Sequence, residues 1–200
     1  MRTRLRRDEQ VERNRNRLLD AARTVFLSRG YIGATLDEIS EHAGFSKGLV
    51  YSQFDSKADL FFALLERRIT ARAAENAAAT RTAKGFQGLL ELLRIAERDD
   101  AAEPEWGRLL VEFRIVAARD RQLNRRYAAA HARTVDMFEA TVDELFARAG
   151  HKPPIPAREL AELALVVQVG GILEQAADPS AKQLRSFMAL LRLVFEAGQR

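Results

Sequence analysis

The chain has 200 residues, a formal net charge of +4 and no cysteine. This length is enough for a two-part protein with its own hydrophobic core, and the lack of cysteine excludes disulfides, thiolate catalysis and cysteine-ligated zinc sites. The N-terminus has no apolar signal-peptide region, and the longest apolar run, Leu163–Leu173, is interrupted by Gln168. We therefore expect neither a signal peptide nor a membrane contact, and a cytoplasmic location.

The first 17 residues are strongly basic. They hold seven arginines against three acidic residues, a net +4 that equals the excess of the whole chain. A basic arm ahead of a DNA-binding element can lie along phosphates or enter a minor groove. The alternative is a solvated tail, which charge runs commonly form.

A first helix is expected over residues 11–29, ending at Gly30. Its apolar positions recur at helical spacing on one face: Leu18, Ala22, Val25 and Phe26.

Residues 35–54 have the pattern of two short helices joined by a tight turn. Thr35 and Glu38 form a T-x-x-E capping box, which predicts that a helix begins at Leu36. Gly44 suits the left-handed conformation that ends such a helix.

The second short helix is predicted to begin after Ser46, which can cap it. Val50 and Phe54 are four positions apart and face inward, which leaves an exposed face of small, basic and hydroxyl side chains. Two helices with a glycine turn and such a face indicate a DNA-reading helix-turn-helix.

A fourth helix is expected from Ser56, which forms a second capping-box pattern with Asp59, to about residue 81. No Pro- or Gly-rich linker follows, so this helix should belong to both halves of the chain. We place the domain boundary just before it: residues 1–56 form the basic arm and helix-turn-helix domain, and residues 57–200 form a C-terminal domain.

Residues 13–69 resemble the TetR/AcrR family of transcriptional regulators. The matching positions are Ala21-Ala22, Phe26, Gly30-Tyr31, Thr35, Ile39-Ser40, Ala43 to Gly48, Tyr51, Phe54, Ser56-Lys57 and Leu60. The chain departs from the family pattern at Ser52-Gln53, where His or Asn followed by Tyr or His is frequent, and at Ser40, where Ala is commoner. The resemblance implies dimerisation through the last two long helices.

Nine residues are predicted to contact DNA: Thr35, Ser46, Lys47, Gly48, Leu49, Tyr51, Ser52, Gln53 and Lys57. Thr35 and Lys57 stand at helix N-termini, which favour phosphate, and Tyr51 and Gln53 should add phosphate contacts. The positions at 47–49 and 52 are candidates for base edges, with Gly48 allowing close approach. The alternative for Tyr51 is a place in the core.

Five further helices are expected in the C-terminal region: four over about residues 85–98, 104–116, 121–149 and 157–177, and a last one from a cap at Ser180 to about residue 198. Pro104 suits a first helical turn, Gly150 a stop, and Ser180 with Gln183 a cap. The fold class is therefore all-α, with about nine helices: a three-helix DNA-binding domain and a helical ligand-binding and dimerisation domain.

The last two helices are apolar around most of their circumference, beyond the stripe that a surface helix needs. We interpret them as a two-fold interface that forms a four-helix bundle from two chains. The residues assigned to it are Leu163, Val167, Gly170, Gly171, Leu184, Phe187, Leu191 and Val194. The alternative is two fully buried core helices.

Catalytic and metal-binding patterns are lacking in the sequence. The three histidines are scattered without ligand spacing, and no nucleotide-binding loop or nucleophile motif is present, so we expect no metal, no cofactor and no enzyme activity. The C-terminal helices can instead enclose a cavity for a small ligand. The alternative is that the same apolar side chains form ordinary core. Its candidate lining is Trp106, Phe113, His131, Phe138 and Gln168.

Three functions compete on these observations. The first is a homodimeric repressor that binds a near-palindromic DNA operator and is released by a small, mostly hydrophobic ligand. The second is a DNA-binding regulator without such an inducer, controlled by a protein partner or unregulated. The third is a helical enzyme or adaptor that merely contains the helix-turn-helix shape.

Overall fold

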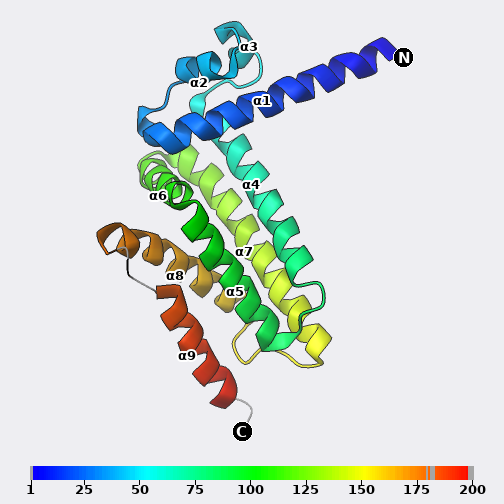
Figure 1. The fold of residues 1–200 in the computed structure, drawn as a ribbon, viewed down its shortest axis with the longest axis vertical. Helices are drawn as coiled ribbons and strands as arrows, with labels where there is room; N and C mark the ends of the chain where they lie inside the picture. The colour runs from blue at the N-terminus through cyan, green and yellow to red at the C-terminus, as the bar shows by residue number, and fades with distance from the viewer. Residues whose placement is uncertain (1, 179, 181–182, 198–200) are drawn as a thin grey trace. The chain divides into compact units, whose positions relative to one another are not determined.

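A computed structural model describes residues 2–178, 180 and 183–197, and this part of the chain is all α-helical (Figure 1). The helices are α1 (Arg2–Gly33), α2 (Leu36–Ala43), α3 (Lys47–Tyr51), α4 (Lys57–Ala79), α5 (Gly85–Ala102), α6 (Pro104–Ala118), α7 (Arg121–Ala149), α8 (Ala157–Ala177) and α9 (Gln183–Ala197). Over the described residues, the expected all-α class and the two-part arrangement are confirmed.

The chain forms two compact units, Met1–Arg68 and Ile69–Arg200, and the division falls inside α4. The boundary expected from the sequence lies at the start of that helix instead. The difference has a packing reason: the first turns of α4 bury Leu60, Phe61 and Leu64, and Phe61 packs in the core of the first unit.

An aromatic cluster fills the centre of the first unit. The Phe61 ring lies 5.6 Å from that of Phe26 and 5.3 Å from that of Tyr31, both in edge-to-face geometry. The predicted inward face of α1 is buried, since Leu18, Phe26 and Ala22 are fully inaccessible. Burial of aromatic and aliphatic side chains of this size is the dominant favourable term in folding.

Helix α1 begins at Arg2, earlier than the residue 11 expected from its apolar stripe. Four of residues 2–10 are arginine, which is a good helix former without being apolar. Gly30 departs from helical geometry with φ 71° and ψ 174°, so the regular helix does end where the glycine predicts. The short continuation to Gly33 follows that kink.

The second unit contains a helical core in which α5 and α7 approach closely. A Cβ placed at Gly88 would lie 2.3 Å from Leu145 Cδ2, and one at Gly107 would lie 2.9 Å from Ile172 Cδ1. A side chain at either position would therefore force Leu145 or Ile172 to move from its place in the core. The same core buries Leu89, Val142 and Leu160 from three different helices, and Leu191 from α9 packs among them.

The boundaries of α7 and α8 fall at the residues predicted from sequence. Asp120 caps α7 through its side chain, which accepts from Gln122 N and Leu123 N, and Gly150 ends the helix with φ 78°. Pro104 opens α6 as expected. Of the predicted cap of α9, the Ser180 hydroxyl donates to Asp178 Oδ1 at 2.7 Å, and the helix is described from Gln183. Residues 181–182 between them and the predicted end at Gly198 lie outside the described residues.

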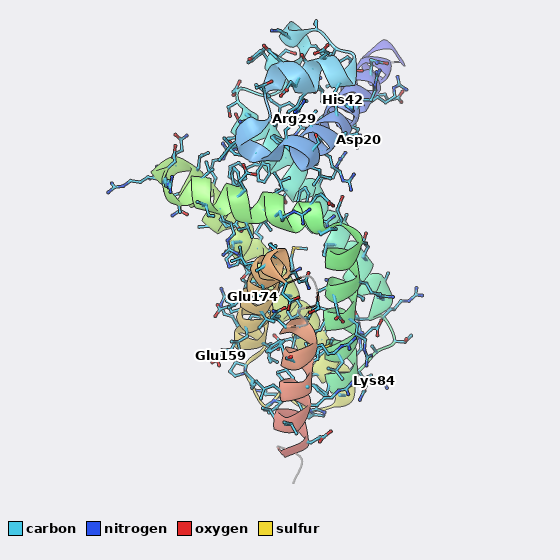
Figure 2. The ribbon with its side chains drawn as sticks, turned by 60° about the vertical axis from the view of Figure 1, so that its left-hand side comes forward. Asp20, Arg29, His42, Lys84, Glu159 and Glu174 are labelled. Carbon is cyan, nitrogen blue, oxygen red and sulfur yellow. The ribbon has the colours of Figure 1, made fainter. Side chains whose placement is uncertain are left out.

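Helix α8 leaves much of its apolar surface uncovered in the single chain. Val166 is 68 % exposed, and Leu163 and Leu173 are also exposed; Figure 2 shows Glu159 and Glu174 near the two ends of the same helix. By length and composition α8, with a mean hydropathy of 1.4, would also suffice to cross a membrane. The run Leu163–Leu173 itself is bordered by Glu162 and Glu174, so this helix reaches that hydropathy as an average over 18 residues and not as an unbroken apolar segment.

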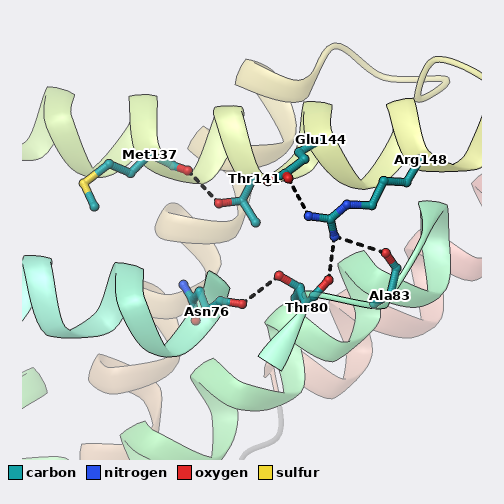
Figure 3. Close-up of polar contacts among 7 residues, drawn as sticks. All are labelled: Asn76, Thr80, Ala83, Met137, Thr141, Glu144 and Arg148. Atoms are coloured by element: carbon teal, nitrogen blue, oxygen red, sulfur yellow. Dashed lines mark hydrogen bonds and ion pairs between the residues drawn. The ribbon is translucent and has the colours of Figure 1, made fainter. Parts of the chain in front are cut away.

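Arg148, near the end of α7, holds the turn between α4 and α5 (Figure 3). Its Nη1 donates to the carbonyl oxygens of Thr80 at 2.7 Å and Ala83 at 3.4 Å. Its Nη2 pairs with Glu144, and the Thr80 hydroxyl donates to Asn76 O at 2.7 Å. The turn's carbonyls thus receive hydrogen bonds that the helix itself cannot supply.

Candidate nucleic-acid interface

Helix α2 is fixed at both ends by the residues that the sequence indicates. The Thr35 hydroxyl accepts from Glu38 N at 3.1 Å, and the Glu38 carboxylate accepts from Thr35 N at 3.1 Å, which completes the capping box. Gly44 ends the helix in the left-handed region with φ 69°. The donors of Thr35 that were expected to face phosphate are therefore engaged by Glu38 in this structure.

Two arginines of α1 contact the residues around α2 and α3 and hold these helices in place. The sequence alone did not reveal this role. The Arg17 guanidinium donates to Ala43 O at 3.1 Å and lies 4.6 Å from the centre of the Phe45 ring. Arg15 lies 4.7 Å from the centre of the Phe54 ring. These cation–π contacts tie α1 to the residues on either side of α3. Their partners are far along the chain, so no local motif signals them.

Helix α3 presents an open outer face. Val50 is fully buried and Phe54 is 4 % exposed, whereas Tyr51 is 53 % exposed. Tyr51 is thus outside the core, and the alternative considered for it from the sequence does not apply. A Cβ at Gly48 would meet no atom within 4 Å, so no packing in this structure requires glycine at that position.

The cap of α3 and its polar positions are arranged around this face. The Ser46 hydroxyl accepts from Leu49 N at 3.4 Å, and the Ser52 hydroxyl donates to Leu49 O at 2.7 Å. Leu49 is half-buried. Gln53 differs from the others because its Oε1 is buried and accepts no hydrogen bond from any residue that the structure describes.

Lys47 forms an ion pair with Asp37 that joins the start of α3 to α2. The hydrogen bond to Asp37 raises the pKa of the Lys47 ammonium, and the charge of Asp37 adds to this effect. Both side chains are exposed, so water screens the pair and it contributes little to stability. The lysine stays charged at neutral pH and remains accessible from outside the chain.

Lys57 has an internal set of partners that the sequence did not predict. Its Nζ donates to Tyr31 O at 2.7 Å, Ala34 O at 2.8 Å and Ile32 O at 3.2 Å, and it lies 4.7 Å from the centre of the Tyr31 ring. The ammonium therefore caps the carbonyl-rich end of α1. The phosphate contact expected of Lys57 stays a prediction, and it would have to coexist with this capping role.

The family model for bacterial regulatory proteins of the tetR family matches residues 18–64, which run from the buried part of α1 into α4. Over 66 residues the chain is 47 % identical to the HTH-type transcriptional activator FasR of Mycolicibacterium smegmatis, a match that covers 33 % of this chain and 28 % of FasR. Residues 18–64 therefore belong to the tetR family of bacterial regulatory proteins. This match to FasR spans well under two thirds of that relative's length.

The fold of the chain is shared with solved structures over nearly its whole length. A putative TetR-family transcriptional regulator from Rhodococcus sp. superposes with a TM-score of 0.77 at 18 % identity, covering 91 % of this chain and 98 % of that one. FadR from Bacillus subtilis in complex with stearoyl-CoA gives a TM-score of 0.67 at 15 % identity, with 90 % and 95 % covered. At these identities the likeness concerns the fold.

The candidate ligand residues do not all lie together. On α6 and α7, the Phe113 and Tyr127 rings are 6.0 Å apart, and the Tyr127 and His131 rings are 6.3 Å apart. Phe138 instead packs against the core cluster of α5, α7, α8 and α9. Trp106 and Phe113 are buried, and Gln168 is half-buried.

Tyr127 was missed from the sequence, although it stands between two of the predicted residues. Burial raises the pKa of the Tyr127 hydroxyl, against the effect of nearby Arg114. Burial also lowers the pKa of His131, and Arg114 lowers it further. The aromatic group thus combines partly desolvated polar atoms with one cation, which suits a ligand that has both apolar and polar parts.

The predicted interface residues on α8 and α9 divide into two groups. Leu163 and Val194 are exposed in the single chain, but Leu191 is 3 % exposed and belongs to the core of its own unit. Leu191 therefore cannot offer its side chain to a partner: its helical position faces α5 and α7 rather than outward. The remaining positions, Leu184 and those that line the groove between α8 and α9, are at least partly covered by these two helices themselves.

An open groove of about 380 Å³ lies between α8 and α9. Its lining includes Val167, Gly170, Gly171 and Phe187 from the predicted interface set, together with Glu174. A Cβ at Gly170 would meet nothing within 4 Å. Gly170 thus borders open space, as a site of helix approach would require, whereas Gly171 is buried and a Cβ there would lie 3.9 Å from Gln183 Cβ.

Proposed function

We propose that this protein is a sequence-specific DNA-binding transcriptional regulator that reads a near-palindromic operator as a homodimer in the cytoplasm. The observation that carries the proposal is the outer face of α3, where Lys47 and Tyr51 are exposed and Gly48 borders open space. A helix with such a face, capped and held by a second helix, fits the major groove. The family model for tetR regulatory proteins matches this same segment.

The proposal assigns different tasks to the predicted DNA contacts. Lys47, Gly48, Leu49 and Ser52 would meet base edges, while Thr35, Ser46, Tyr51, Gln53 and Lys57 would meet phosphates. The Lys47 ammonium would exchange Asp37 for a base or phosphate oxygen on binding, since both partners of the pair are exposed. Thr35 would approach phosphate beside the Glu38 carboxylate, which makes it the least favoured of the phosphate contacts on electrostatic grounds.

We further propose that the uncovered apolar face of α8 and α9 joins two chains. Exposed side chains such as Val166 and Leu163 are large and apolar, and burying them against a second copy would remove this surface from water. A two-fold interface also supplies the symmetry that a near-palindromic operator requires. A second copy of the chain on this face accounts for the apolarity of α8 without a membrane.

Release by a small, mostly hydrophobic ligand is the proposed regulation. The aromatic group of Phe113, Tyr127 and His131, with Arg114 beside it, supports a ligand that has an apolar body and a polar or anionic end. Helix α4 runs unbroken from Lys57 to Ala79 and carries residues of both units, so it offers a covalent route for coupling. A coupling of about 1–3 kcal/mol would change operator affinity by roughly 5–150-fold.

The test is a gel-shift titration of the purified protein on its own upstream DNA, followed by the same titration with added ligands. We expect binding to one near-palindromic site, and its weakening by an amphipathic probe. Stearoyl-CoA, the ligand of the B. subtilis FadR structure, is a suitable first probe. Absence of site-specific binding would refute the regulator.

Binding that no compound in an apolar and amphipathic screen reduces would favour the second candidate, a regulator without an inducer. A reporter gene downstream of the bound site decides the sign of regulation. Repression in the absence of ligand is the expected result. The alternative is activation, the role given in the name of the relative FasR.

A further inference from the structure

The N-terminal half of α1 is a basic helix with no core to cover. Residues 8–13 are exposed, and the aliphatic side chain of Val11 among them is 50 % accessible. In Figure 1 this part of the helix extends past α2 and α3 toward the N-terminus. Burial of α1 in the first unit begins at about Leu18, and its contacts with the helix-turn-helix begin at Arg15, so the packing of the first unit does not explain why the helix begins at Arg2.

The chemistry of this extension favours a polyanion over an apolar protein partner. Seven of residues 2–17 are arginine and three are acidic, while Leu5 and Val11 are the aliphatic residues. The described polar side chains there pair locally: Gln10 donates to Asn14 at 2.9 Å, and Arg13 donates to Gln10 at 2.9 Å. Such a helix has no apolar stripe for docking on a protein surface.

Its register places four arginine positions on one face of the helix. Positions 2, 6, 13 and 17 are separated by four, seven and four residues, a spacing that falls on one face of a continuous helix. Arg17 marks that face, because its guanidinium contacts Ala43 O and the Phe45 ring next to the start of α3. The other three positions continue the same face away from the turn.

We propose that residues 2–17 of α1 form a second phosphate-binding surface, which contacts duplex DNA flanking the sequence read by α3. This inference rests on the proposed function. Residues 2 to 17 span about 22 Å of helix at 1.5 Å per residue, which corresponds to about six base pairs at 3.4 Å each. The surface therefore enlarges the footprint of each half-site without adding sequence preference.

The test compares the unmodified protein with the triple variant Arg2→Gln/Arg6→Gln/Arg13→Gln. Glutamine keeps a helix propensity close to that of arginine, so α1 should persist. The control is Arg119→Gln/Arg121→Gln/Arg125→Gln, which removes the same charge from exposed positions of the second unit. Each protein is titrated over a range of salt concentrations with an operator duplex cut at the half-site ends, and with one extended by six base pairs on each side.

We expect the extended duplex to bind the unmodified protein and the control more tightly, with a steeper salt dependence. The triple variant should lose this gain, and its slope of log K against log salt should flatten by about 0.9 for each phosphate that the removed arginines would have neutralised. A triple variant that keeps the full gain from the flanking base pairs would overturn the inference. It would also be overturned if residues 2–17 of α1 bound single-stranded RNA more tightly than duplex DNA.

The two proposals fail separately. If the unmodified protein bound the short operator specifically but ignored the flanks, only the role of the α1 extension would fail. If it bound no operator, the proposed function would fail, and an arbitrary duplex at low salt would then test the extension. Weaker binding of the triple variant than of the control to that duplex would support it, and equal binding would refute it.

Discussion

Gly48 and Gly88 are glycines for different reasons. A Cβ at Gly88 would lie 2.3 Å from Leu145 Cδ2, so any side chain there would force Leu145 to shift in the packing of α5 on α7. A Cβ at Gly48 would meet no atom within 4 Å, and alanine would be the better helix former at that position. The folded chain therefore gives no reason for glycine at 48, whereas a closely approaching duplex would.

Gly48→Ala separates these two sources of constraint. We expect unfolding stability to stay the same or rise by up to about 1 kcal/mol, because alanine has the higher helix propensity and the space is open. Specific DNA binding should weaken by about 1–3 kcal/mol, the value of one good base contact. Thermal unfolding and operator titration measure the two effects. Unchanged operator affinity would remove Gly48 from the interface.

Lys57→Met tests the capping role of the ammonium. The variant loses three hydrogen bonds to the carbonyls of Tyr31, Ile32 and Ala34, and we expect a loss of about 2 kcal/mol in unfolding free energy, since hydrogen bonds to charged groups are stronger than neutral ones. The matched control is Lys84→Met, at an exposed position (Figure 2). Equal unfolding midpoints for the two variants would contradict the capping role.

The same variant also tests the predicted phosphate contact. Under conditions where Lys57→Met is folded, removal of a lysine that touches phosphate should weaken binding to all sequences alike and flatten the salt slope by about 0.9 per phosphate. A slope equal to that of the unmodified protein would leave Lys57 with its structural role alone.

Helix ends in this protein are stabilised in two ways. The caps of α2 and α7 come from residues within three positions of the helix start, Thr35 and Asp120. The end of α4 depends instead on Arg148, which reaches the carbonyls of Thr80 and Ala83 from α7 (Figure 3). The second kind of stabilisation joins elements that are distant in the sequence, and it fixes the end of the helix that belongs to both units.

Arg148→Met should therefore destabilise the second unit by about 2 kcal/mol, because two carbonyls lose a charged donor. Glu144→Gln is the control, since it removes only the exposed ion pair of the same arginine; we expect it to stay within about 0.5 kcal/mol of the unmodified protein. Urea unfolding followed by circular dichroism measures both variants. Equal effects would mean that Arg148 stabilises the unit through its ion pair with Glu144 and not through its hydrogen bonds to the turn.

At the scale of the whole molecule, the apolar outer face of α8 and α9 remains to be covered. Leu163, Val166 and Leu190 are exposed there in the single chain, and the adjoining groove is lined by Gly170 and Gly171. A second copy of the chain would cover this face. It would also bring two α3 helices to one operator, where successive major grooves are about 34–36 Å apart.

Leu163→Glu should convert the proposed dimer to monomers, since it would place an unpaired carboxylate in an apolar interface. Helix content should not change, because the side chain is 45 % exposed in the single chain, and specific operator binding should be lost. Ile115→Glu makes the same substitution at a similarly exposed position on α6 and should leave the mass unchanged. Light scattering that gave a monomer for the unmodified protein would refute the assembly.

Leu191 is unsuitable for this test, because its side chain is buried in the core and a charge there would unfold the unit.

Much of the secondary structure could be predicted from the sequence alone. The capping box of Thr35, the stop at Gly44 and the limits of α7 each depend on residues only a few positions apart, so local hydrogen bonding and helical period determine them. The all-α class and the exposure of Tyr51 on an outer helical face follow from the same short-range pattern.

Only the tertiary structure decided the roles of several side chains. Lys57 caps α1, Arg17 holds the turn before α3, and Leu191 fills the core instead of facing outward. The partners of Lys57 and Arg17 lie 23 to 26 positions away in the chain, and that of Arg148 lies 68 positions away. A pattern that repeats every few residues carries no information about such partners, because they are chosen by how the helices pack against one another.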